Sequence, residues 1–335
     1  PTLIKVPKPF MISKPVFDFI GISPGYNEWD VSICFIIYFT IFFGMIVGDA
    51  GYGLLFLLCA IFAKYKYRKI EKFNLPINLL FVLSSSTIIW GILSCSYFGI
   101  AQDKLPSLLA NTLCFKPLTD ADPNKNNHIQ LFCFILAATH LSFARLWKAW
   151  ILKNLKSLGQ IGWALMIWAN FITVIKLLIY PGQFPQITFI MYGISIVLLL
   201  IFYINWKELG DIFNFPFGLI GSFTDVLSYI RLFAVGISSY YVANSFNDMG
   251  KMIFGISPWL FIFGVLVIFF GHILNIMLAV LGVLVHGIRL NTLEFSNHME
   301  LQWSGFTYKP FKIPETELNI AEVRTAFEES RKAKK

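Results

Sequence analysis

The chain has 335 residues, of which 56% are hydrophobic and only 14% are charged, and its mean hydropathy is +0.66. This composition excludes an ordinary soluble domain and favours a membrane protein. The formal net charge is +8, but the Phe residues lie mainly inside the hydrophobic runs, so no basic stripe with exposed aromatics is present. We therefore expect no nucleic-acid partner, and we expect a lipid bilayer around the chain.

The predicted elements are helices, because an all-α bundle satisfies its own backbone hydrogen bonds in lipid. A spanning helix needs about 20 mainly apolar residues. Eight candidates occur, at 31–47, 50–63, 77–98, 129–147, 161–179, 188–204, 222–246 and 258–293. The last is long enough that it must tilt steeply, protrude or bend, and Gly271 is the expected site of a bend.

The loops between these segments differ in charge. The basic run at 64–72 and the lysines and arginine at 145–156 lie on the side of both termini, whereas the loop at 101–127 lies opposite. Positive charge marks cytoplasmic loops, so we expect cytoplasmic termini in a cell membrane. We divide the chain into a cytoplasmic segment at 1–30, a six-helix membrane portion at 31–204, a two-helix portion at 205–295 and a cytoplasmic tail at 296–335. The chain begins without Met or a signal peptide, and we interpret it as a piece of a longer protein.

Cysteine spacing gives no sign of a metal site or a disulfide framework. The five cysteines include no C-x-x-C pair, and only Cys114 stands outside an apolar run. We predict that they are small apolar fillers.

Arg231 lies deep inside the segment at 222–246, with apolar residues on both sides. An arginine there cannot lose its proton, and a charge inside a bilayer usually faces a partner or an ion path. Helical spacing places a small, polar face beside it, which another surface can approach closely. That face comprises Ser228, Arg231, Ala234, Ser238, Tyr241 and Ser245. A salt bridge with Asp225, or with another buried acid, is the structural alternative.

The segment at 258–293 carries a second arginine on a polar stripe. Spacings of three and four place His272, Asn275, Ala279, Gly282, His286 and Arg289 on one face. Such a face indicates either a water-lined path or a hydrogen-bonded helix seam. Glu294 follows about one turn beyond Arg289.

The glycine-rich turn at 48–53 contains Asp49. We expect its carboxylate to accept hydrogen bonds from backbone amides of the turn, and the alternative is that it lies at the entrance of an ion path.

Three stretches of the chain resemble the membrane domain of the stator subunit of V-type and A-type rotary ATPases, called subunit a or subunit I. They are FFGMIVGDAGYGLL at 42–55, DVLSYIRLFAVGIS at 225–238 and HILNIMLAVLGVLVHGIRLNTLEF at 272–295, and FTYKPFKI at 306–313 is similar to the family's last element. The resemblance implies that Arg231 is the family's indispensable arginine and Arg289 its second one. Eukaryotic members commonly carry an acid near the position of Ala279 and a His in place of Tyr52, so the departures suggest a prokaryotic inner-membrane protein.

The resemblance further implies a non-catalytic subunit that needs no cofactor and couples proton or sodium flow to ATP hydrolysis or synthesis. Its partners would be a rotor ring of small helical subunits, a peripheral stalk and an ATP-hydrolysing head. Half-channel lining is expected from a set of polar residues: Asp49, Asp225, Ser228, Ser238, His272, Asn275, His286 and Glu294. Two other classes remain open, a secondary transporter, which would normally show repeat symmetry, and a structural anchor, which would leave the buried arginines unexplained.

Overall fold

The structure is a computed structural model that describes residues 7–25, 28–100, 102–106, 114–120 and 122–305. Over these residues it is helical, with two isolated bridges, Ser23 to Ser304 and Tyr97 to Ile100, in place of a sheet. The predicted element at 306–313 lies outside the described residues. The predicted all-α class is confirmed.

Every predicted apolar segment contains a helix. The main helices are α1 (Lys14–Ile20), α2 (Ser32–Val47), α3 (Ala50–Lys66), α4 (Asn74–Leu93), α6 (Lys125–Leu152), α7 (Lys156–Val174), α8 (Gln186–Leu198), α9 (Leu209–Ser228), α10 (Ile230–Ile256), α11 (Phe261–Gly282) and α12 (Phe295–Met299). Within the described residues, six helical runs are long and apolar enough to cross a membrane, and α2 is a shorter apolar helix. The protein is therefore a multi-pass membrane protein.

The last two predicted helices are longer than their apolar cores. The segment predicted at 222–246 begins at Leu209 and forms a 48-residue run to Ile256, interrupted only by a turn at Tyr229. Pro216 lies inside α9 and does not end it, although it removes one backbone donor. The segment predicted at 258–293 extends over 39 residues, from Phe261 to Met299.

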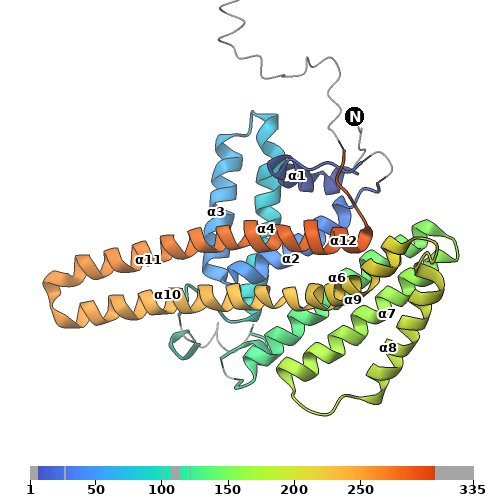
Figure 1. The fold of residues 1–335 in the computed structure, drawn as a ribbon. Helices are drawn as coiled ribbons and strands as arrows, with labels where there is room; N and C mark the ends of the chain where they lie inside the picture. Colours follow the sequence, from blue (N-terminus) through green and yellow to red (C-terminus); the bar gives the residue numbers. More distant parts are fainter. Residues whose placement is uncertain (1–6, 26–27, 101, 107–113, 121, 306–335) are drawn as a thin grey trace, which may run out of the picture.

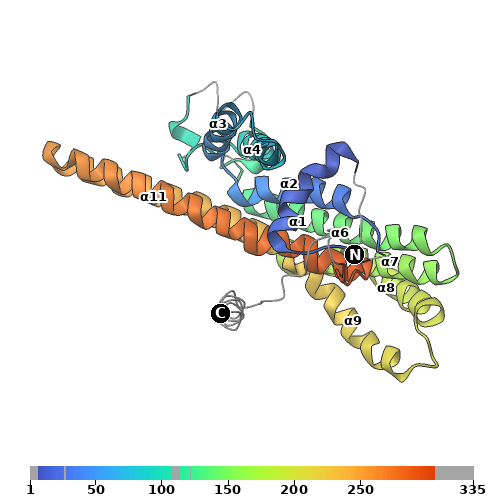
Figure 2. The ribbon, with the colours of Figure 1, turned by 90° about the horizontal axis from the view of Figure 1, so that it is seen from above.

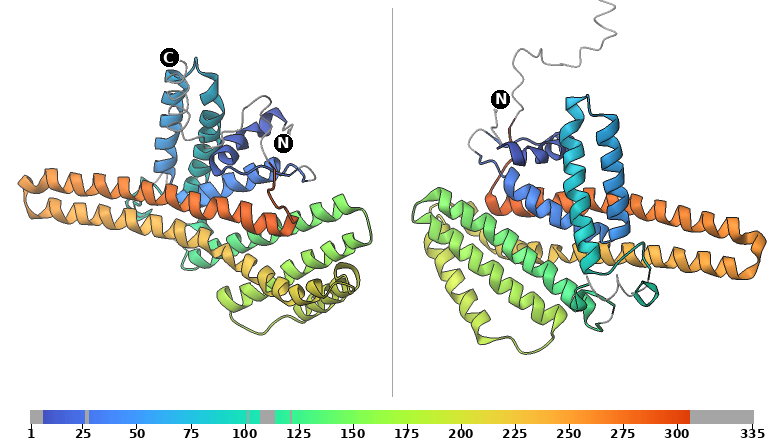
Figure 3. Two further views of the ribbon diagram at one scale, coloured as in Figure 1. Left: turned by 45° about the horizontal axis from the view of Figure 1, so that its top comes forward. Right: turned by 180° about the vertical axis from the view of Figure 1, so that it is seen from behind.

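In Figure 1, α10 and α11 lie side by side as one long pair that crosses the α3–α4 hairpin at a large angle. Figure 2 shows α11 extending far beyond α3, α4 and α6. Both views of Figure 3 place α6, α7 and α8 as a separate group beside this pair. The helix α11 continues through Gly271 without interruption. A Cβ there would collide with the Phe246 ring of α10, so Gly271 permits close packing of the two helices.

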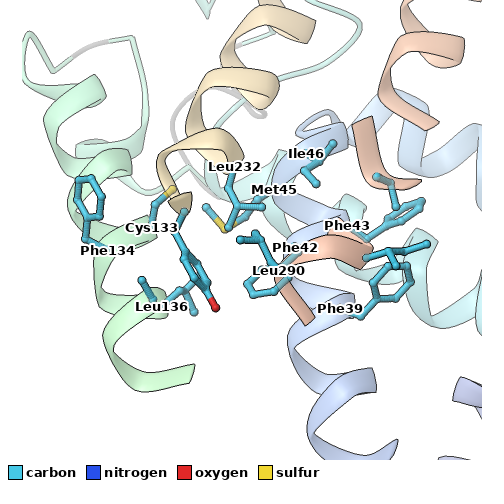
Figure 4. Close-up of a cluster of buried hydrophobic side chains, with 14 of the residues drawn as sticks. Phe39, Phe42, Phe43, Met45, Ile46, Cys133, Phe134, Leu136, Leu232 and Leu290 are labelled. Atoms are coloured by element: carbon cyan, nitrogen blue, oxygen red, sulfur yellow. The ribbon is translucent and has the colours of Figure 1, made fainter. Parts of the chain in front are cut away.

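The core lies where α2 meets α6, α10 and the end of the last helix (Figure 4). Phe42 and Met45 of α2 are at most 3% exposed, and Leu232 and Leu290 reach the same cluster from the two long helices. In soluble proteins, burying such a side chain contributes about 1.5–3 kcal/mol to the free energy of folding. In lipid, helix association is instead stabilised by tight packing. The core therefore fixes the two long helices relative to each other at residues 232 and 290.

The cysteine prediction is wrong at two positions. Cys95, just after α4, forms a disulfide with Cys114, and 19 positions separate them in the sequence. The other cysteines, Cys34, Cys59 and Cys133, are free. Sequence spacing could not indicate the bond, because the return of the loop at 101–127 to the end of α4 brings the two residues together.

Candidate functional site

Arg231 and Arg289 are brought to one site by their neighbours in the sequence. Leu232 and Leu290 are 1% and 0% exposed, and both pack in the core around α2. The two guanidinium groups face the same carboxylate: Arg231 Nη1 lies 3.8 Å and Arg289 Nε lies 3.5 Å from Glu294 Oε1. Two fixed cations thus share one acid.

The ion pairs at this site are incomplete. The Arg231 side chain is 31% exposed and that of Arg289 is 50% exposed, whereas Glu294 is 5% exposed. Arg231 Nη1 and Glu294 Oε2 have no hydrogen-bond partner among the described residues. A separation of 3.8 Å is also too long for a hydrogen bond. The cluster therefore holds two positive charges and one negative charge, and part of the Arg231 side chain remains exposed.

The expected alternative partner of Arg231 was Asp225, and the structure pairs this acid differently. Asp225 Oδ2 lies 3.0 Å from His298 Nε2. The alternative also allowed a salt bridge between Arg231 and another buried acid. Glu294 is that acid. Its contacts with two arginines mean that loss of Arg231 alone would leave it paired with Arg289.

Two π-helical turns, η8 (Val283–Gly287) and η9 (Leu290–Glu294), place Glu294 on the same face of the helix as Arg289. A π turn bonds residues five apart, so it brings the residue at i+5 to the face that i+4 occupies in an α-helix. Glu294 is the fifth residue after Arg289. Such turns are frequent at functional sites, and hydropathy does not indicate them.

A hydrogen-bonded chain links the polar stripe of α11 to α3 and α10. Asn275 Nδ2 donates to the Tyr52 hydroxyl at 3.0 Å, and this hydroxyl lies 2.6 Å from His272 Nδ1. His272 Nε2 lies 3.1 Å from Asn247 Oδ1. The expected helix seam is therefore present, and it includes Tyr52 and Asn247, which the stripe did not indicate.

A cavity of about 500 Å³ opens along the α10–α11 seam. Ser238, Asn275 and His286 line it, together with the small residues Ala279 and Gly282. Among the described residues, three polar atoms on its walls have no protein partner: Asn275 Oδ1, His286 Nδ1 and the Ser239 hydroxyl. Buried polar groups normally find a partner or a water, so these atoms indicate a hydrated space.

Two predicted lining residues have local structural roles. Asp49 is 4% exposed and accepts hydrogen bonds from the backbone amides of Gly51, Tyr52, Phe98 and Gly99 and from the Ser96 hydroxyl. This confirms the expectation that it bonds the turn. Ser228 is 7% exposed, and its hydroxyl donates to the Asp225 carbonyl at 2.8 Å.

No family model matches the chain. It is similar to the V-type ATP synthase subunit I of Borreliella burgdorferi, with 34% identity over 93% of this chain and 54% of the relative. For V-type ATP synthase subunit I 1 of Treponema pallidum the identity is 32%, over 93% and 52% of the two chains. For A-type ATP synthase subunit I of Methanocaldococcus jannaschii it is 26%, over 92% and 48%.

The chain belongs to the subunit I family of V-type and A-type ATP synthases. It spans about half the length of the curated relatives that it matches. The resemblance predicted from the sequence is confirmed.

This subunit I chain contains a second ionic cluster that the sequence did not indicate. Arg145 of α6 is only 7% exposed, and it donates to His298 Nδ1 at 2.9 Å and to Gln160 Oε1 at 3.0 Å. Glu300 lies 3.5 Å from Arg145 and 3.4 Å from Lys148. Arg145 is one of the charges expected in a cytoplasmic loop, and its place inside the segment predicted at 129–147 is the sequence signal for its burial.

Proposed function

We propose that this chain is the ion-translocating stator subunit of a rotary V/A-type ATPase. It provides two half-channels and an essential arginine, Arg231, which exchange protons or sodium ions with carboxylates of a rotor ring. Ion flow is thereby coupled to ATP hydrolysis or synthesis in a head joined through a peripheral stalk. The printed names of the relatives, ATP synthase subunit I, support this assembly. The chain itself is non-catalytic in this proposal.

The unbalanced charge at Arg231 carries the proposal. Within the described residues, Arg231 and Arg289 share Glu294, and Arg231 Nη1 has no hydrogen-bond partner. A carboxylate that approaches the exposed part of the Arg231 side chain would neutralise the excess charge. Away from the arginine, a carboxylate in lipid is favoured in a neutral, ion-loaded form. Each ring site would therefore empty beside Arg231 and refill after leaving it.

The face of α10 beside Arg231 supports the proposal that a rotor ring packs closely against this helix. Ala234, Ser238, Tyr241 and Ser245 are exposed, as expected for a surface that another helix approaches. The adjacent cavity along α10 and α11 supplies the polar atoms of Ser238, Asn275 and His286. We assign this cavity and the chain from Asn275 to His272 to the external half-channel.

The cytoplasmic half-channel is assigned to the acids beyond Arg231. Asp225 lies 3.0 Å from His298, and His298 follows Glu294 by one helical turn and bonds Arg145, so both acids are on the side of the site toward the basic cluster of Arg145. Arg231 separates the two half-channels, because a cation that keeps its proton blocks direct ion passage. Each monovalent ion that crosses 100 mV exchanges about 2.3 kcal/mol with the rotor, so several ions drive one ATP.

The test is reconstitution of the chain in liposomes, alone and in its complete complex. We expect ATP-driven acidification or sodium uptake by the complex and no ion flux through the chain alone. Flux through the isolated chain would favour a secondary transporter. A complex that hydrolyses ATP without moving ions would favour a structural anchor.

A second experiment tests the proposed topology, in which both termini are cytoplasmic and the loop at 101–127 is external. The Cys95–Cys114 disulfide supports this orientation, because disulfides persist in oxidising compartments. We expect Lys116→Cys to react with an impermeant thiol reagent only from outside sealed vesicles, and Lys69→Cys only from the cytoplasmic side, when the free cysteines are replaced. Reaction of Lys116→Cys from the cytoplasmic side alone would contradict the topology.

A further inference from the structure

Arg145 is more deeply buried than either arginine of the proposed ion site. It is 7% exposed, its guanidinium lies 5.0 Å from the centre of the Trp163 ring, and its donors reach His298 and Gln160. A buried cation is costly unless its partners are well placed. Its partners therefore indicate what it does.

The hydrogen bonds of Arg145 fix the protonation of its neighbour. Arginine only donates, so His298 Nδ1, 2.9 Å from Arg145 Nε, must offer a lone pair. The proton of the neutral imidazole then lies on Nε2, which donates to Asp225 Oδ2 at 3.0 Å. His298 is 2% exposed, so water does not compete for either nitrogen. The order is Arg145 to His298 to Asp225, with each donor defined.

This chain of bonds joins three elements at the border of the ion site. Arg145 belongs to α6, Asp225 to α9 and His298 to α12, where it follows Glu294 by four residues on the same helical face. The charged or titratable groups around His298 come from every neighbouring element: Arg145, His140 and Lys148 of α6, Asp225 of α9, Tyr203 of η6 (Leu199–Tyr203), and Glu294 and Glu300 nearby in the sequence.

We propose that Arg145 and His298 are positioning residues that hold the Asp225 carboxylate away from the arginine pair. The inference rests on the proposed function, because it concerns the availability of Arg231 to a ring carboxylate. Asp225 Oδ2 lies 3.0 Å from His298, which follows Glu294 by one helical turn. Freed from His298, Asp225 would offer the arginines an anion that belongs to the same chain. That anion would compete with the ring for Arg231.

The test uses His298→Ala and His298→Gln in the complete complex. The alanine variant releases Asp225, and we expect coupled transport per assembled complex to fall about tenfold, as for other losses of an orienting partner. The glutamine variant keeps an amide that accepts from Arg145 and donates to Asp225, so most of the transport should return.

These outcomes separate the inference from the proposed function. If the wild-type complex shows no coupled transport, the proposed function fails. If the wild-type complex transports ions and His298→Ala transports equally well, or if His298→Gln restores nothing, only the positioning role is overturned. Should His298→Ala not assemble, ¹⁵N-histidine spectra of the wild-type complex decide. We expect a neutral His298 protonated at Nε2, and an imidazolium or an Nδ1–H form would overturn the proposal.

Discussion

Replacing Arg231 with alanine is expected to abolish coupled ion transport while the complex still assembles. The variant removes the donors available to a ring carboxylate, and loss of one preorganised donor at an electrostatic site costs about 10²- to 10³-fold in rate. Folding should survive, because Glu294 keeps its contact with Arg289 at 3.5 Å. Arg231→Lys should fail nearly as badly, since lysine lacks the planar fork and loses its proton more readily when desolvated.

The measurement is ATP-driven acidification or sodium uptake in liposomes, divided by the amount of assembled complex. Lys251→Ala is the matched control, because Lys251 is also a cation of α10 but pairs with Asp248 at an exposed position. It should leave transport unchanged. Normal transport by an assembled Arg231→Ala complex would rule out the mechanism. Loss of assembly in proportion to loss of transport would mean that Arg231 only balances Glu294.

The second large effect is expected at Asp49, and it concerns stability. Asp49→Ala would leave the buried amides of Gly51, Phe98 and Gly99 without the carboxylate that they now contact at 2.7, 2.8 and 3.0 Å. Each buried donor without a partner costs about 1–3 kcal/mol, so the three together should cost about 3 kcal/mol or more. Asp49→Asn should be intermediate, because its amide nitrogen would face other donors.

The thermal midpoint of the purified chain in detergent measures this effect. Asp122→Ala is the control, since Asp122 accepts one exposed backbone bond, from Asn124 at 2.8 Å, and lies 3.3 Å from His128. Its loss should cost less than about 1 kcal/mol. An unchanged midpoint for Asp49→Ala would show that the α2–α3 turn is held by other contacts.

Hydropathy predicted where the helices lie because each one must satisfy its own backbone and face lipid or protein with apolar residues. It predicted their ends less well. Pro216 and the glycines near it favour a later start for the penultimate helix, yet α9 begins at Leu209. A membrane helix tolerates such residues because an irregular backbone at the same depth would expose unpaired backbone groups to lipid.

Helical spacing predicted that Asn275, Ala279 and Gly282 share one face, and these residues are buried together along the seam with α10. It did not indicate that Glu294 is the acid shared by Arg231 and Arg289. That arrangement needs the π turns η8 and η9, which change the register of the helix. A register change of this kind depends on packing and leaves no period in the sequence.

The sequence by itself determined that the chain lies in a lipid bilayer, the order of its helices, its family, and the presence of two arginines that keep their protons. These properties follow from composition, local periodicity and short motifs. Only the tertiary structure decided the partners: Glu294 for Arg231, His298 for Asp225, Tyr52 for His272 and Cys95 for Cys114. Most of these residues are far apart in the sequence, so contacts among α2, α6, α10 and the last helix determine which of them meet. Local periodicity carries no record of those contacts, because it specifies the face of a helix but not the helix that packs against it.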